Sequence, residues 1–202
     1  RDQPRSRGLG DVYKRQYHSR YSSWSCYRGQ ESDNWVADLA PTPTEFAPNQ
    51  LSPEGATGTL REMRRHGGWQ NMHNRERLHS EEDFPMSKTF EDGIDFLNRN
   101  GRYDNWFLQI ETFDPHEPFT SPTSHFDPDC ATQPDWPPYA DVTEGPEEIE
   151  AIRTKYEASV RFCDRQLGRV LDLMDELDLW KDTMLIVNTC LLYTSPSPRD
   201  RG

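Results

Sequence analysis

Residues 156–189 read YEASVRFCDRQLGRVLDLMDELDLWKDTMLIVNT, a helical pattern that runs directly into a short apolar segment. Apolar residues recur every three or four positions from Ile149 to Leu177, and Pro146 stands where a first helical turn tolerates proline. This spacing predicts one long amphipathic helix that packs along a sheet. The recurring residues are Ile149, Ile152, Tyr156, Val160, Cys163, Leu167, Val170 or Leu171, Met174 and Leu177. TMLIVNT, residues 183–189, is continuous enough to be a strand buried on both faces of a parallel sheet.

A second strand and a second helix are predicted upstream. NWFLQIETF, residues 105–113, has the aromatic and β-branched content of a strand. Residues 87–100 predict a helix that Ser87 caps and Gly101 ends. A shorter helix is expected at residues 55–65, a polar segment at 66–84 and a proline-rich loop at 120–145.

The order of these elements predicts an α/β fold. A strand, a long helix and a second strand form a right-handed βαβ unit, which places the two strands parallel in one sheet. Their carboxyl ends then share the edge at which open α/β sheets bind ligands. The loop that follows residue 113 is therefore the first place to look for a functional site.

That loop, FDPHEPF at residues 113–119, offers Asp114, His116 and Glu117 between two stiffening prolines. An imidazole with little conformational freedom suits anion binding or proton transfer. The alternative is that Asp114 and His116 only satisfy the backbone of a turn. The position at a strand end leaves both interpretations open.

Composition excludes some classes of function. The formal net charge of −12 argues against a nucleic-acid partner, which would require a basic patch. No segment approaches the ~20 apolar residues of a membrane span. Hydrophobic content of 33% and a mean hydropathy of −1.00 are low for a self-sufficient core, although 11% aromatic residues argue against plain disorder. Cys26, Cys130 and Cys163 lie too far apart to suggest a disulfide framework or a zinc site.

Other polar residues are weaker candidates. Arg28 could face an anionic substrate group, but a structural or surface role is favoured. Histidines and arginines between residues 64 and 79 could line a pocket, but their spacing favours a solvated loop. Asp127 and Asp129 lack the frame of a calcium loop. Six scattered tryptophans could stack on sugars, and packing is the default explanation for them. The histidines and arginines between residues 64 and 79 are Arg64, Arg65, His66, His73, Arg75, Arg77 and His79.

The strand, the loop and the long helix together resemble the sulfatase family of the alkaline-phosphatase superfamily. In that family a strand leads into a P-H-x-P loop, followed by a helix of the form Y-x-A-x-V-x-x-x-D-x-x-x-G-x-x-L. The matching positions are Tyr156, Ala158, Val160, Asp164, Gly168 and Leu171. YSSWSCYRGQESDNW, residues 21–35, resembles a further segment of these enzymes. The resemblance implies part of an alkaline-phosphatase-like three-layer sandwich with a mostly parallel central sheet.

The same resemblance implies hydrolysis of the sulfate ester of a small molecule or glycan. A formylglycine made from a C/S-x-P-x-R motif would act on a divalent metal, usually calcium. His116 matches the histidine that contacts the sulfate and assists the leaving group, and Asp114 and Arg28 are further substrate-binding candidates. The cysteines lie outside such a motif, and the metal-binding Asp is expected only after Thr189. The polypeptide as written is therefore expected to bind no catalytic metal and to be inactive.

Both ends of the chain are expected to be foreign to this domain. SRGLGDVYKRQ, residues 6–16, and CLLYTSPSPRD, residues 190–200, are antisense translations of one DNA stretch, which resembles a sequencing-library adapter. Residues 1–16 and 190–202 are therefore expected to be adapter-derived and disordered. Residues 17–189 are expected to be the central part of a sulfatase catalytic domain.

Three alternatives stay open. A phosphodiesterase or phosphonate monoester hydrolase of the same superfamily would use the same loop. A non-catalytic module could bind carbohydrate or a protein partner through the acidic, tryptophan-bearing surface. The fragment could also fail to fold on its own.

Overall fold

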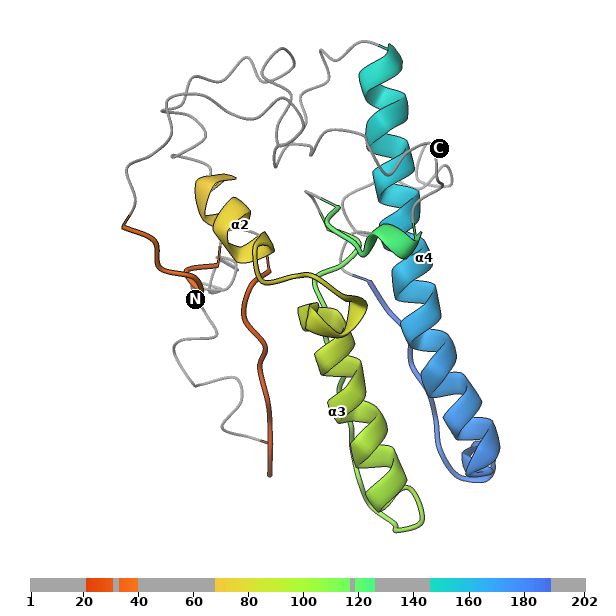
Figure 1. Cartoon of the computed structure of the whole chain (residues 1–202). Coiled ribbons are helices and arrows are strands. Elements are labelled where there is room, and N and C mark those ends of the chain that lie inside the picture. The colour runs from red at the N-terminus through yellow and green to blue at the C-terminus, as the bar shows by residue number, and fades with distance from the viewer. Residues whose placement is uncertain (1–20, 31–32, 40–67, 117–118, 126–145, 190–202) are drawn as a thin grey trace, which may run out of the picture.

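The computed structural model describes residues 21–30, 33–39, 68–116, 119–125 and 146–189 (Figure 1). Within these ranges the regular secondary structure is helical. The elements in chain order are α2 (Gly68–Arg75), η3 (Glu81–Asp83), α3 (Pro85–Asn100), η4 (Thr123–His125), α4 (Pro146–Glu176) and η5 (Leu179–Lys181).

Helix α3 confirms the predicted helix, but it begins two residues earlier. Phe84 is its N-cap and Pro85 occupies the first turn, where a missing N–H costs nothing. Ser87 does not cap the helix as expected. Its side chain is buried, and its hydroxyl oxygen accepts a hydrogen bond from Gln166 Nε2 at 3.4 Å. Gly101 ends the helix as predicted, and its N–H donates to the Leu97 carbonyl at 2.8 Å.

Helix α4 confirms the long helix, but its buried face differs from the apolar stripe in the sequence. Ile149, Tyr156, Val160 and Leu177 belong to the predicted stripe, yet each remains 38–46% exposed. The buried face includes three polar side chains, so the spacing of apolar residues alone does not identify this face. Its most buried members are Lys155, Ala158, Ser159, Phe162, Gln166, Val170 and Met174.

Helices α3 and α4 lie side by side and form the core (Figure 1). At one end Phe162 is fully buried against Phe84 and Met86. Toward the other end, Leu97 of α3 packs in one cluster with residues of α4 and η5. These residues are Val170, Leu173, Met174 and Leu179.

The segments predicted to be strands are extended but form no β-ladder among the described residues. Residues 105–113 return along α3, and residues 183–189 return along α4 (Figure 1). Trp106, Leu108 and Ile110 pack on the core, whereas Phe107 is 73% exposed. The side chains alternate as in a strand, but a strand also requires hydrogen bonds to a neighbour. The prediction of two β-strands is therefore wrong for the described residues, although residues 105–113 are extended with alternating side chains. Residues 183–189 were expected to be buried on both faces, but Met184, Ile186 and Val187 are 66–82% exposed because no neighbouring strand or helix covers them among the described residues.

Helix α2 corrects the prediction for residues 66–84, which were expected to be polar and irregular. Its side chains are mainly polar, so apolar spacing could not reveal it. Residues 120–125 of the predicted loop contain the helical turn η4. The helix predicted at residues 55–65 and the two chain ends, 1–16 and 190–202, lie outside the described residues.

Candidate functional site

The His116 loop, residues 113–116 and 119, leaves the extended segment that returns along α3. The Phe119 N–H donates to the His116 carbonyl at 3.0 Å, which closes the loop on itself. The Phe113 and His116 rings meet edge to face, with centroids 6.1 Å apart. The loop backbone is therefore closed at His116, and the imidazole contacts the Phe113 ring.

Phe119 anchors this loop on α4. Its ring is buried and contacts Tyr156 edge to face, with centroids 5.5 Å apart. Its φ of 56° is the left-handed conformation that a bulky residue rarely adopts. Such backbone is kept where surrounding packing enforces it. Lys155, adjacent to Tyr156, is buried as well, which composition alone would not suggest for a lysine.

Asp114 is bound by a residue from a distant part of the chain. Its Oδ1 accepts a hydrogen bond from Gln30 Nε2 at 3.3 Å. Burial raises the pKa of the Cys163 thiol on α4 to about 12, and the charge of Asp114 adds to the rise. The two candidate residues Asp114 and His116 thus share one anchored loop.

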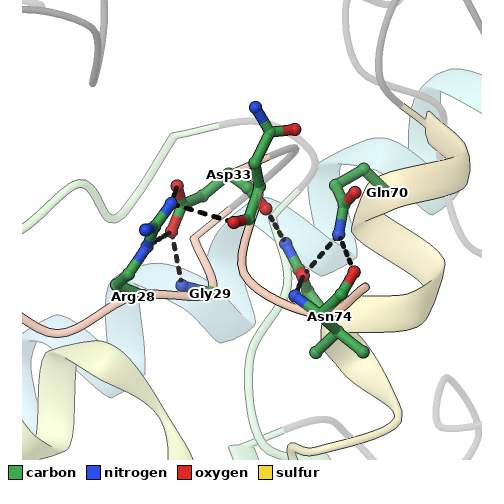
Figure 2. A network of polar contacts seen from close by, with 7 residues as sticks. Arg28, Gly29, Asp33, Gln70 and Asn74 are labelled. Atoms are coloured by element: carbon green, nitrogen blue, oxygen red, sulfur yellow. Dashed lines mark hydrogen bonds and ion pairs between the residues drawn. The ribbon is translucent and has the colours of Figure 1, made fainter. Parts of the chain in front are cut away.

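Arg28 is occupied by an ion pair within its own turn. Its guanidinium binds the Asp33 carboxylate twice, at 2.9 Å from Nε and 2.6 Å from Nη2 (Figure 2). Nη2 also donates to the Asn34 carbonyl at 3.0 Å. Burial alone would raise the pKa of Asp33, but hydrogen bonds from Arg28 and from the Gly29 N–H hold it below its ordinary value. These contacts favour the structural role for Arg28, and its substrate-binding role stays a prediction.

Asn74 of α2 holds the same turn from the other side (Figure 2). Its side chain is fully buried. Its Nδ2 donates to the Asp33 carbonyl at 2.8 Å, and its Oδ1 accepts from the Val36 N–H at 3.2 Å and from Gln70 Nε2 at 3.0 Å. Nothing in the local sequence pattern singles out Asn74, because its partners lie about 40 residues upstream.

The described histidines and arginines of residues 64–79 lie on α2 or directly after it. His73 and Arg75 belong to α2, and His73 Nδ1 lies 3.4 Å from Asp38 Oδ2. His79 follows the helix and is exposed. Arg64, Arg65, His66, Asp127 and Asp129 lie outside the described residues.

Glu81 forms a second polar centre, which the sequence did not predict. Its Oε2 lies 3.0 Å from His125 Nε2, and its Oε1 accepts from Gln166 Nε2 at 3.0 Å. Arg165 Nε lies 3.3 Å from the same Oε1. Both carboxylate oxygens are therefore used to join η3, η4 and α4, which is a structural task.

The described residues contain no group of three or more His, Cys, Asp or Glu side chains that could hold a metal ion. The donor set for the divalent cation that the resemblance implies is thus not found in this part of the chain. None of the described helices is long and apolar enough to cross a membrane.

A family model described as Sulfatase matches residues 6–188. The chain belongs to the sulfatase family. The match contains the His116 loop, all described helices and nearly all of the second extended segment. No curated protein and no solved structure matches the chain.

Membership of the sulfatase family implies an alkaline-phosphatase-like α/β fold, of which the described residues form helices and extended segments without a β-ladder. It also places the chain among hydrolases that act on sulfate esters. The family also generally binds a divalent metal. Within its helix pattern, Ala158 is fully buried and Asp164 is exposed. Gly168 has open space where a Cβ would stand, so steric exclusion does not explain that glycine.

The buried thiol of Cys163 gives a prediction about reactivity. The thiolate is the reactive form, and a pKa of about 12 leaves almost none of it at pH 8.5. We expect iodoacetamide to alkylate Cys163 about 100-fold more slowly in the folded chain than in guanidinium. Peptide mapping by mass spectrometry separates Cys163 from the exposed Cys26. Equal labelling of the two cysteines in the folded chain would contradict the burial of Cys163.

Proposed function

We propose that the chain belongs to a sulfuric ester hydrolase whose His116 imidazole contacts the sulfate group of a sulfated small molecule or glycan. The match of residues 6–188 to the sulfatase family carries this proposal. The anchored loop supports it, because a fixed imidazole binds an anion with little further loss of conformational freedom.

The role proposed for His116 follows from the chemistry of sulfate transfer. Negative charge develops on the sulfate oxygens and on the leaving group as the ester bond breaks. An imidazole N–H can donate a hydrogen bond to that charge, and a protonated ring can pass its proton to the leaving oxygen. Asp114, two residues earlier, is proposed as a second substrate-binding candidate.

A formylglycine nucleophile, a calcium ion or another divalent cation, and a mostly parallel sheet within a three-layer sandwich are proposed on the basis of family membership. The described residues do not supply a metal site, so no step is assigned to the metal.

Replacing His116 tests the proposal by binding rather than by turnover. We expect the full chain to bind 4-nitrophenyl sulfate and His116→Ala to bind it at least tenfold more weakly, because about 1.5–3 kcal/mol is typical for hydrogen bonds to charged groups. Isothermal titration calorimetry measures both affinities. His79→Ala is the matched control, since His79 is exposed and lies on a different segment.

Two results would contradict the proposal. One is the same affinity in His116→Ala and in the unmodified chain. The other is at least tenfold tighter binding of 4-nitrophenyl phosphate, which would favour the phosphodiesterase or phosphonate hydrolase alternative.

A further inference from the structure

A hydrogen bond joins the His116 loop to a segment far upstream in the sequence. Gln30 Nε2 donates to Asp114 Oδ1 at 3.3 Å, across 84 positions of sequence. Both side chains are partly buried, so water competes less for the bond than it would at an open surface. A carboxylate acceptor strengthens such a bond relative to a neutral pair.

The backbone of Gln30 is itself fixed. Its carbonyl accepts the Asp33 N–H at 3.0 Å, which closes a tight turn. The preceding Gly29 has φ 110°, and a Cβ at this position would overlap the Trp35 ring, so the turn requires glycine. Arg28 and Asp33 then bracket the turn with their ion pair.

Helix α2 holds this turn in place (Figure 2). The buried Asn74 side chain binds the Asp33 carbonyl and the Val36 N–H. Gln70 Nε2 donates to the Val36 carbonyl at 2.7 Å. A continuous set of contacts thus runs from α2 through the turn to Gln30.

At the other end of this path, Asp114 stands two residues before His116. Phe119 of the same loop packs against Tyr156 of α4, so the loop contacts α4 through Phe119 and the turn that carries Gln30 through Asp114. The Phe119 N–H closes the loop on the His116 carbonyl. Movement of Asp114 would therefore be transmitted to the His116 backbone within one short loop.

We propose that Gln30 is a positioning residue for His116: its amide fixes Asp114, and Asn74 fixes the turn that carries Gln30. The inference rests on the proposed role of His116 in sulfate binding. Gln30 acts through Asp114 and touches no substrate. Its contribution is to reduce the range of orientations that the imidazole samples before the anion binds.

The test uses the full chain and two variants, Gln30→Ala and Gln30→Glu. The first removes the amide, and the second keeps the shape but replaces the donor with an acceptor that faces the Asp114 carboxylate. We expect both to weaken the binding of inorganic sulfate by about threefold to tenfold, the effect of one lost hydrogen bond. NMR titration of the His116 ring measures the affinity.

A second readout works without sulfate. Hydrogen exchange of the Phe119 amide reports closure of the loop, and we expect it to be about threefold to tenfold faster in Gln30→Ala. Gln109→Ala is the matched control, because Gln109 pairs with Tyr21 and Glu111 outside this loop. It should change neither readout.

The outcomes separate the two proposals. If the unmodified chain binds sulfate and Gln30→Ala binds it equally well, the positioning role is wrong while the proposed function stands. If the unmodified chain binds no sulfate but Gln30→Ala speeds Phe119 exchange, the positioning of the loop stands and the proposed function falls. Unchanged Phe119 exchange in a chain that binds no sulfate overturns both.

Discussion

Phe162→Ala is expected to lower the free energy of unfolding by about 3–5 kcal/mol, the usual cost of removing a buried aromatic ring. Phe162 is fully buried. Its ring centroid lies 5.6 Å from that of Phe84 and 5.1 Å from that of His125. The substitution would leave a cavity where α3, η4 and α4 meet. Because domains are typically stable by only about 5–15 kcal/mol, such a loss would unfold much of the population under mild denaturing conditions.

Urea denaturation followed by circular dichroism measures this change. Val160→Ala serves as the control on the same helix, because Val160 is 38% exposed and its truncation should cost less than about 1 kcal/mol. Equal effects of the two substitutions would show that α4 buries a different face. A broad transition without cooperativity in the unmodified chain would contradict the presence of a packed core.

Asn74→Ala is expected to lower the free energy of unfolding by about 2–4 kcal/mol. The truncation leaves the Asp33 carbonyl, the Val36 N–H and the Gln70 amide without the partner that Asn74 provides. Buried polar groups that lose a partner keep the cost of their desolvation. The change should therefore exceed that of an ordinary surface substitution.

Asn98→Ala is the matched control, since Asn98 is exposed on α3. It should change the stability by no more than about 0.5 kcal/mol. Thermal and urea denaturation of both variants give the comparison. Asn74→Ala with the stability of Asn98→Ala would mean that the turn does not depend on α2.

The long elements could be predicted because their local signals agree with their final positions. Apolar spacing and the glycine at its end predicted α3, and apolar spacing with Pro146 at its start predicted the extent of α4. The buried face of α4 could not be predicted in this way. Lys155, Ser159 and Gln166 are buried there by tertiary contacts, and a search for apolar repeats passes over them.

Helix α2 and the turn that it holds depend on interactions between distant residues. Asn74 and Gln70 bind backbone groups more than 30 positions away, which no local pattern encodes. For the two extended segments, local composition predicted a structure that does not form among the described residues. Their β-forming composition predicted strands, but ladder hydrogen bonds require a neighbouring strand, and composition does not specify one.

Some residues of the candidate site were predicted from the sequence, and others became visible only in the structure. His116 and Asp114 were identified from the loop and from its resemblance to a family motif, and the structure places both in one anchored loop. The sequence left two roles open for Arg28, substrate binding and a structural role. Its ion pair with Asp33 favours the structural role, and the sequence did not predict that pair. The Gln30 contact was not predicted, because it becomes visible only when the two segments are brought together.

If His116 meets the sulfate group of the substrate, NMR of the histidine rings detects the contact at the imidazole itself. On addition of 4-nitrophenyl sulfate to the full chain, we predict a saturable shift of the His116 ring signals, with His73, His79 and His125 unchanged. His116→Gln identifies the signal by its disappearance. Unmoved His116 signals, or an equal shift at the exposed His79, would show that His116 does not bind the sulfate group specifically.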